Sequence, residues 1–525
     1  MNTRVIVKKS TYRDSISLMK ISNSISKLPG ITQAAVVMAT ELNRRVLSEA
    51  GFVDAAIGSA SNNDMIVAIE AKEAASLDAA LTETERLLSP GEKPAGEEAP
   101  PTSLDEALEL FPDANLAVIS VPGQFAKREA MHALGRGLNV FLFSSNVSRE
   151  EEVELKKVAK EKRLLLMGPD CGTSIINHKV LGFGNTIREG TIGLVSASGT
   201  GLQEVTTLIH KAGLGISQAI GTGGGDLSEQ VGGTTMIQGF EWLEEEEQTK
   251  VIVLISKQPA PGTMEKVLEV ARRSRKPVVV NFLGGVVSPP LLGKLRSANT
   301  LEDAARIACE LAGIKPGGAA FIIPKETISV ALANHRKLAR SQQYIRGLFS
   351  GGTLCYESET ILQPLFGEVF SNAPIKPENN IPGDAPSKKH TCIDMGAEEF
   401  VEGRAHPMID FSLRNLRILQ EAKDPETAVI LIDVELGYGS NDDPAGQLVP
   451  VIQQAKVLAK EAGRHLPFVA SVVGTEGDFQ GLASQEKALS GAGVLIMPSN
   501  AQATRVSALI ASGETIEAAI FGRSN

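Results

Sequence analysis

The stretch Thr191-Ile-Gly-Leu-Val-Ser-Ala-Ser-Gly-Thr-Gly-Leu202 decides the fold class of this sequence. An apolar strand runs into a turn of glycines and small hydroxyl residues, and a helix follows from Leu202. Gly-rich turns between a buried strand and a helix are typical of parallel α/β sheets, where ligands bind beyond the carboxyl ends of the strands. The sequence therefore predicts an α/β fold with a ligand site at this turn.

Four residues of this turn are candidate phosphate ligands: Ser196, Ser198, Gly199 and Thr200. Their backbone N–H groups converge with the helix dipole behind them, which suits a phosphate or a carboxylate. The alternative is a plain N-cap in which Ser198 caps the helix. The local pattern leaves both interpretations open.

A second turn, Gly437-Tyr-Gly-Ser-Asn-Asp-Asp-Pro-Ala-Gly446, joins another apolar strand to a long helix. Gly437, Gly439 and Ser440 permit close approach by an anion. Asp443 fits the N-cap and Pro444 the first helical turn, so the start of the helix is well marked. The acidic pair Asp442 and Asp443 opposes an anion unless a metal or a cap uses it, and taken alone this turn favours a structural role.

Composition limits the class of protein. The chain has 525 residues, which predicts three or four domains. Hydrophobic residues make up 42%, charged residues 22% and aromatic residues 4%, and the net charge is −10. Such a chain is neither disordered nor suited to nucleic acid, which needs basic stripes and stacking rings. No apolar run reaches membrane-spanning length and no secretory signal is visible at the start, so we expect a cytoplasmic protein.

Strands and helices alternate along most of the chain. Residues 1–89 predict a small α+β module, and the Pro- and Glu-rich stretch Pro90–Thr102 predicts a linker. Three α/β segments follow at 103–190, 191–315 and 343–525. Their apolar runs predict buried parallel strands: Leu116–Ser120, Asn139–Phe143, Leu164–Met167, Thr191–Val195, Gln218–Gly221, Val251–Ser256, Pro277–Leu283, Ala428–Val434, Pro467–Val473 and Val494–Met497.

Further glycine turns follow strands at Gly221–Asp226, Phe349–Cys355 and Gly474–Asp478. A lone glycine pair is usually only a tight turn, and repetition at strand ends is what favours a ligand site. The acidic residues Asp226, Asp442 and Asp443 make Mg²⁺ a candidate, although the pattern assigns no certain cofactor and predicts no metal centre. The four cysteines predict neither a disulfide framework nor a zinc site.

These turns resemble those of succinyl-CoA synthetase. The run Gly193–Thr200 with Gly221–Asp226 is similar to the ligase domain of the alpha subunit, and Val121–Lys127 with Gly168–Gly172 is similar to the second half of its CoA-binding domain. The turn Gly437–Gly446 and the run Val473–Gly477 resemble the carboxy-terminal domain of the beta subunit. The resemblance implies a CoA-binding-like Rossmann domain at 103–190, a ligase domain at 191–315 and a second flavodoxin-like domain at 343–525.

The chain is identified as a member of the FdrA family of acyl-CoA synthetase-like proteins, which it resembles over nearly its whole length. Five stretches carry this resemblance: Thr11–Ser15, Met167–Thr173, Ile255–Pro259, Tyr344–Cys355 and Gly403–Asp410. The family is named for CoA ligases but includes a subunit of oxamate carbamoyltransferase, which interconverts oxalurate and carbamoyl phosphate in ureide (allantoin) breakdown. The resemblance places Cys171, Gly223, Gly224, Gly351 and Gly352 in the vicinity of substrate or CoA.

Three absences separate these activities. A succinyl-CoA synthetase needs a phosphate-carrying histidine shortly after the strand Pro277–Leu283, yet the chain has no histidine between His210 and His335, and Gly284–Pro290 offers no replacement nucleophile. None of the four segments reads as an ATP-grasp domain, which would need roughly 100–200 residues. The Gly-rich first turn that holds CoA phosphates in the alpha subunit is also missing, which argues against CoA binding.

We therefore expect a subunit of a carbamoyl- or acyl-phosphate-using transferase that acts with other protein subunits. The turns Ser196–Gly201 and Gly437–Gly446 would face one another and hold the phosphoryl group. Three further residues are candidate catalytic residues: Arg404 and His406, with Arg404 clamping an oxamate-type carboxylate, and Lys257, pairing with an anion. The alternatives are a CoA ligase that obtains nucleotide handling from a partner, and a non-catalytic metabolite-binding regulator.

Overall fold

The structure of the chain, a computed structural model, describes residues 2–89, 100–285, 294–314 and 321–517. Residues 90–99 of the predicted linker, and residues 286–290 of the stretch searched for a nucleophile, lie outside the described residues. The chain forms two compact units. The first unit contains Met1–Thr102 and Gly396–Leu413, and the second contains Ser103–Met395 and Arg414–Asn525.

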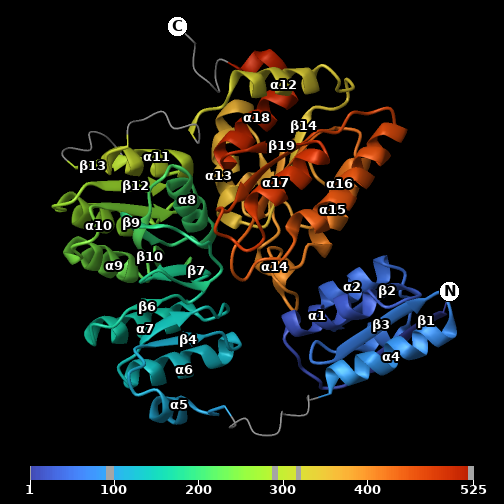
Figure 1. Cartoon of the computed structure of the whole chain (residues 1–525), viewed down its shortest axis with the longest axis horizontal. Coiled ribbons are helices and arrows are strands. Elements are labelled where there is room, and N and C mark those ends of the chain that lie inside the picture. The colour runs from blue at the N-terminus through green and yellow to red at the C-terminus, as the bar shows by residue number, and fades with distance from the viewer. Residues whose placement is uncertain (1, 90–99, 286–293, 315–320, 518–525) are drawn as a thin grey trace. The chain divides into compact units, whose positions relative to one another are not determined.

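The first unit is the small α+β module that the sequence predicts (Figure 1). Its antiparallel sheet has the order β1-β3-β2. Its elements are β1 (Asn2–Lys8), α1 (Ser15–Ser26), β2 (Ile31–Met38), α2 (Glu41–Glu49), α3 (Ala55–Ser59), β3 (Met65–Ala71) and α4 (Ala74–Leu88). The segment Gly396–Leu413, which we call the returning segment, adds α14 (Glu398–Val401) to this unit. Separate apolar cores lie on the two faces of the sheet, one with Leu18 and Ile25, the other with Leu47 and Phe52.

The second unit begins with a short three-stranded parallel sheet of order β4-β5-β6. Its elements are α5 (Leu104–Leu110), β4 (Leu116–Ile119), α6 (Gly123–Gly135), β5 (Asn139–Leu142), α7 (Arg149–Glu161) and β6 (Leu166–Met167). A capping box at Ser148 starts α7, because the Ser148 hydroxyl accepts from the Glu151 N–H while the Glu151 carboxylate accepts from the Ser148 N–H. This sheet corresponds to half of a doubly wound fold.

A seven-stranded sheet follows, with the order β13-β12-β11-β9-β10-β7-β8. The strands β9 to β13 run parallel, and the hairpin of β7 and β8 pairs antiparallel at the edge, which extends the sheet across the predicted boundary at residue 190. Its elements are β7 (Thr173–Ile176), β8 (Lys179–Gly182), β9 (Glu189–Ser196), α8 (Gly199–Lys211), β10 (Ile216–Gly221), α9 (Thr234–Glu245), β11 (Val251–Ser256), α10 (Pro261–Arg272), β12 (Val278–Phe282), β13 (Leu295–Ser297) and α11 (Leu301–Leu311).

A six-stranded parallel sheet of order β15-β16-β14-β17-β18-β19 completes the second unit. Its elements are α12 (Lys325–His335), β14 (Tyr344–Phe349), α13 (Gly352–Phe366), β15 (Phe370–Ser371), β16 (Thr391–Asp394), α15 (Ser412–Lys423), β17 (Thr427–Glu435), α16 (Pro444–Glu461), β18 (Phe468–Val473), α17 (Leu482–Gly491), β19 (Val494–Met497) and α18 (Asn500–Ser512). The sequence predicts the interior strands well because they are continuous apolar runs. None of the described helices is long and apolar enough to cross a membrane.

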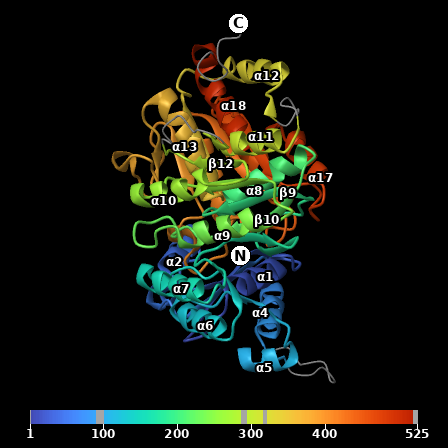
Figure 2. The same ribbon diagram turned by 90° about the vertical axis from the view of Figure 1, so that its left-hand side faces the viewer.

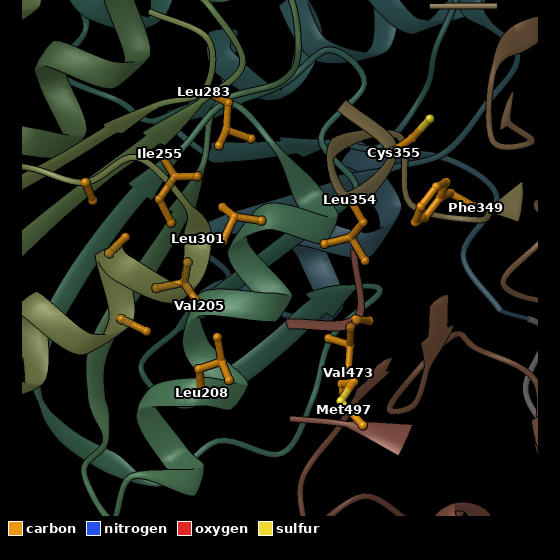
Figure 3. Packing of buried hydrophobic residues seen from close by; sticks show 14 of the residues in the cluster. Val205, Leu208, Ile255, Leu283, Leu301, Phe349, Leu354, Cys355, Val473 and Met497 are labelled. Carbon is orange, nitrogen blue, oxygen red and sulfur yellow. The ribbon is translucent and has the colours of Figure 1, made fainter. Parts of the chain in front are cut away.

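One hydrophobic core joins the seven-stranded and six-stranded sheets. Helix α8 is buried on all sides from Gly201 to His210, and it lies against α11 and α13 (Figure 2). Figure 3 shows Val205 and Leu208 of α8 in the same cluster as Leu354 of α13 and Val473 of β18. Because a single core spans both sheets, the helix starts between them keep a defined geometry.

Candidate functional site

The two larger sheets of the second unit each have a point where the strand order reverses. In the seven-stranded sheet it lies between β9 and β11, and in the six-stranded sheet between β14 and β17. Ligands of open α/β sheets bind beyond the carboxyl ends of the strands at such points. Helices α8 and α13 begin there, because each follows the first strand of its sheet's parallel run, β9 and β14.

The start of α8 is held by its own hydroxyl groups. The Ser198 hydroxyl accepts from the Gly201 N–H at 2.9 Å, and the Ser196 hydroxyl binds both the N–H and the carbonyl oxygen of Ser198. Ser198 is therefore the N-cap that the sequence offered as one of two interpretations. Gly199 and Thr200 remain partly exposed, and N–H groups in the first turn of a helix have no partner within it.

A threonine that sequence reasoning did not select lies beside this turn. The Thr173 hydroxyl, in β7, belongs to a residue only 2% exposed, and its oxygen has no hydrogen-bond partner. A Cβ atom added at Gly199 would lie 3.3 Å from this oxygen. Burying a hydroxyl without a partner costs about 1–3 kcal/mol, so the orphan oxygen indicates a ligand position at the α8 N-terminus. Thr173 ends one of the motifs that carry the family resemblance, which was the only sequence signal for it.

Helix α13 supplies the second helix start at this place. The Ser198 hydroxyl donates to the Thr353 hydroxyl at 2.6 Å. A Cβ atom added at Gly351 would lie 3.0 Å from Cβ of Thr200, so glycine permits the close approach of the two turns. The structure thus brings the predicted residues Ser198 and Thr200 together with the predicted Gly351 and with its neighbour Gly352.

Carboxylates already occupy the α13 side of this junction. Asp433, at the end of β17, accepts from the Ser350 N–H at 2.8 Å and from the Gly351 N–H at 2.7 Å. Arg414 neutralises it through a fully buried ion pair of 2.9 Å. The Asp394 carboxylate lies against Gly352. An anionic ligand is therefore favoured at the α8 start and not at the α13 start.

Lys257 places a positive charge on the same junction. It follows β11, and its Nζ lies 5.6 Å from the centroid of the Tyr356 ring in the first turn of α13. The Lys257 charge lowers the pKa of the buried Glu359, although burial is the larger effect and raises that pKa to about 7. Lys257 is partly exposed, so its ammonium group beside the Tyr356 ring is accessible to solvent.

The turn before α16 does not supply the facing helix start that the sequence predicted. Its backbone N–H groups already bind protein acceptors: that of Gly437 binds the Gln480 side chain at 3.0 Å and that of Tyr438 binds the Gly184 carbonyl at 2.7 Å. Added Cβ atoms at Gly437 and Gly439 would strike Gly184 and Phe183, respectively, so these glycines serve close packing. The helix start that contacts α8 belongs to α13.

Two features of the α16 turn qualify this result. The Ser440 hydroxyl is buried without a hydrogen-bond partner, so its assignment to a ligand stays a prediction. The carboxylate of Asp443 caps α16 by accepting from the Gly446 N–H at 3.1 Å and also accepts from Gln485. Asp443 thus acts as a cap, while Asp442 is exposed.

The remaining predicted substrate residues pack against protein. The turn Gly221–Gly224 lies against the Gly168–Thr173 loop: a Cβ atom at Gly223 would strike the Pro169 carbonyl, and one at Gly224 would lie 3.8 Å from Asp170. Burial raises the pKa of the Cys171 thiol to about 11. Asp226 is fully buried, pairs with Lys156 at 2.7 Å and accepts from the N–H groups at the start of α9. These contacts leave Asp226 no role as a Mg²⁺ ligand.

Arg404 and His406 belong to the first unit, whereas the α8 junction belongs to the second. The Arg404 guanidinium donates to Asn43 at 2.8 Å, to Ser412 at 2.6 Å and to Asp410 at 3.2 Å. His406 accepts from the Met408 N–H at 3.2 Å. Arg404 therefore ties the returning segment to α2.

Comparison with known proteins agrees with this architecture. A family model described as CoA-ligase matches residues 348–510, one described as CoA binding domain matches 187–284, and one described as AllF, heavy metal-associated domain, matches 1–102. The CoA-binding match thus falls mainly on the segment predicted as a ligase domain, and not on 103–190.

Individual relatives differ in how much of the chain they match. The uncharacterized protein YahF of Escherichia coli K12 is 45% identical over 502 residues, which is 95% of this chain and 97% of that protein. The succinate–CoA ligase [ADP-forming] subunit alpha 2 of Archaeoglobus fulgidus is 32% identical over 183 residues. This match covers 34% of this chain and 61% of that subunit. Among solved structures, the dinucleotide-forming acetyl-coenzyme A synthetase 1 of Ca. Korarchaeum cryptofilum is similar over 76% of this chain and 82% of the synthetase chain. The two sequences are 17% identical over this match, and the TM-score is 0.28.

The residues present do not fit the cofactors that these descriptions imply. Residues 1–102 contain neither cysteine nor histidine, so the first module lacks the thiolate and imidazole donors that most often bind heavy metals. For CoA, the turns at Gly168–Thr173 and Gly221–Gly224 fill each other, since a Cβ atom at Gly221 would lie 2.5 Å from the Cys171 sulfur. Among the described residues of 103–170 the sheet has only three strands, without the Gly-rich first turn.

Proposed function

Because this chain belongs to the FdrA and YahF family of acyl-CoA synthetase-like proteins, we propose that it binds a carbamoyl or acyl phosphate at the junction of α8 and α13. It would serve as a subunit of a transferase that moves the carbamoyl or acyl group. The specific reaction that we propose converts oxalurate and phosphate into oxamate and carbamoyl phosphate.

The proposal rests on the unpartnered Thr173 hydroxyl beside the first turn of α8. Together with the N–H groups of Gly199 and Thr200, this hydroxyl offers donors to one anion. Lys257 adds a charge from the neighbouring strand end. Phosphoryl oxygens need several convergent donors, and helix N-termini supply them without a dedicated cofactor.

The reaction needs no covalent intermediate on the protein. An oxygen of hydrogen phosphate attacks the ureido carbonyl carbon of oxalurate, a C–O bond forms, and the bond between that carbon and the inner nitrogen breaks. The proton of hydrogen phosphate passes to the departing nitrogen, which becomes the amide of oxamate. Catalysis then consists of holding the two anions together and stabilising charge on the carbonyl oxygen, which backbone donors can do. The lack of a histidine between His210 and His335 is consistent with this route.

We propose that the chain works with other subunits. The ligases whose alpha subunits match the chain are named as assemblies of subunits, and the chain matches only part of such a subunit. Among the described residues identified at the junction, Arg414 is already paired with Asp433, which leaves Lys257 to bind the oxamate-type carboxylate of the second substrate. A partner chain would complete that half of the site.

The test measures carbamoyl phosphate formed from oxalurate and inorganic phosphate. The purified chain is incubated alone and together with the proteins encoded beside its gene. Formation of carbamoyl phosphate in the mixture supports the proposal, whereas thioester formation that depends on ATP and CoA, without carbamoyl phosphate, contradicts it and favours the CoA-ligase alternative.

A glycine variant locates the site. In Gly199→Val the new side chain would crowd the Thr173 hydroxyl at about 3.3 Å and block the anion position, so phosphate affinity should fall at least tenfold by the loss of a charged hydrogen-bond set. The matched control is Gly491→Val, since nothing lies within 4 Å of a Cβ atom at Gly491 in the same unit. Equal loss in both variants would show that the effect is not local.

A further inference from the structure

The first unit contains a pocket of about 360 Å³ beside strand β2. Helices α1 and α2 and the segment from Gly403 to Ser412 form its walls. Its apolar lining comes from both sides of the sheet: Leu18 and Met19 belong to α1, and Leu47 and Phe52 belong to the core on the opposite face. The volume falls in the range of small-molecule sites, and all its lining residues belong to one compact unit.

The pocket lies at the free edge of a sheet. Strand β2 is an edge strand, and its outward groups are partly satisfied by side chains: the Val36 N–H donates to the Ser22 hydroxyl at 2.8 Å, and Asn43 donates to the Met38 carbonyl at 2.8 Å. Ala34 has the same parity in the strand, so its N–H and C=O also point away from β3. They give the pocket one backbone donor and one backbone acceptor.

Charge in the pocket is balanced. Among the residues that line it, only Arg404 and Asp410 are charged, and they form an ion pair of 3.2 Å. Hydrogen bonds to Asn43 and Ser412 hold the Arg404 side chain in place. A site with one fixed positive and one fixed negative charge disfavours a phosphate or another net anion, because each unpaired ligand charge would be desolvated without compensation.

We propose that this pocket binds a small zwitterionic metabolite of the α-amino acid class with an uncharged, apolar side chain. The ligand carboxylate pairs with Arg404, and its ammonium group with Asp410 and the Ala34 carbonyl. The side chain packs against Leu18 and Met19 of α1. The inference does not depend on the reaction proposed for the second unit, since every residue of the pocket lies in the first.

The first test is calorimetric titration of the full chain. The probes are L-leucine, 4-methylpentanoate, which lacks the ammonium group, 3-methylbutylamine, which lacks the carboxylate, and L-valine, L-methionine and L-phenylalanine for the size of the side chain. At least one of the amino acids should bind with a dissociation constant at or below millimolar, and for L-leucine each analogue should bind at least tenfold more weakly. Failure of all four amino acids to bind at millimolar concentration, or equal binding of the analogues, overturns the proposal.

Two substitutions on α1 locate the binding. Asn23 is exposed and lines the pocket, so Asn23→Trp should close its mouth and abolish amino acid binding. Ser24 is the next residue, equally exposed and not part of the lining, and Ser24→Trp should bind as the unmodified chain does. Binding that survives Asn23→Trp refutes this location. A second outcome also refutes the proposal: the unmodified chain self-associates, the Asn23→Trp chain is monomeric, and neither binds any probe. The pocket would then hold a second copy of the chain.

A charge variant tests the zwitterion. Asp410→Asn keeps an oxygen for Arg404 and leaves the pocket with a net positive charge. The preference should then shift by at least tenfold from L-leucine toward 4-methylpentanoate. An unchanged ranking would overturn the proposal. Carbamoyl phosphate formation is not measured in any of these experiments, so their failure and that of the proposed reaction are distinguishable.

Discussion

Thr173→Val separates a ligand role from a structural role at the α8 junction, because the two roles predict opposite effects. The hydroxyl oxygen is buried and has no partner, so its replacement by a methyl group removes a desolvation penalty of about 1–3 kcal/mol. Valine also suits the strand β7. The variant should therefore unfold at a higher urea concentration than the unmodified chain. If the hydroxyl donates to a bound phosphate, the same change removes a charge-assisted bond worth about 1.5–3 kcal/mol, which weakens phosphate binding by about 10- to 100-fold.

The assay pairs urea unfolding with a calorimetric titration of inorganic phosphate. Thr207→Val is the matched control, because the buried Thr207 hydroxyl, in α8, donates to the Glu204 carbonyl at 3.0 Å. That variant should lose about 1 kcal/mol of stability and keep its phosphate affinity. A Thr173→Val protein that is less stable, or that binds phosphate as tightly as the unmodified chain, would refute the assignment of this hydroxyl to a ligand.

Three further predictions concern buried charges and backbone. Burial raises the pKa of Glu204 to about 7 and that of Glu357 to about 8, so both carboxyl groups favour the neutral form in the fold. Their contribution to the free energy of unfolding should be fully present below about pH 4.5 and fall by up to roughly 1.4 kcal/mol per pH unit for each group, until about pH 7 for Glu204 and about pH 8 for Glu357. Glu357→Gln should reduce this slope in urea titrations across pH. Arg414→Met should cost about 3–5 kcal/mol in urea unfolding, because it leaves the fully buried Asp433 without its cationic partner at 2.9 Å, whereas a loss below about 1 kcal/mol would show that the pair contributes nothing. Gly437→Ala should lower stability by about 1–3 kcal/mol or more, since φ is +98° there and the methyl group meets a backbone carbonyl; thermal denaturation at an unchanged midpoint would contradict this.

The sequence predicts those strands and helices whose pattern of apolar residues is contained within the element itself. Continuous apolar runs identified β11, β17 and β18 to within a residue or two, because a strand covered on both faces carries its signature within itself. The short strands β7 and β8 were missed, since four residues of mixed character give no period. Strand β7 contributes Thr173, whose hydroxyl oxygen is buried without a hydrogen-bond partner.

The returning segment shows a different limit. Within the motif Gly403–Asp410, the sequence predicts catalytic roles for Arg404 and His406. In the structure this segment packs on a module more than 350 positions earlier in the chain, where Arg404 binds Asn43. Nothing in the local pattern states which distant surface an irregular segment will cover, because that choice is made by complementarity of shape and charge on folding.

The sequence by itself determined the α/β class, the hydroxyl cap at Ser198, the glycine turns at strand ends and the lack of a histidine to carry phosphate. Only the tertiary structure decided that α13, and not α16, meets α8. The Ser198 and Thr353 hydroxyls that join the two turns are 155 positions apart. Helix caps and strand periods arise from neighbours in the chain, whereas the pairing of two helix starts depends on which faces of two sheets can bury one common core.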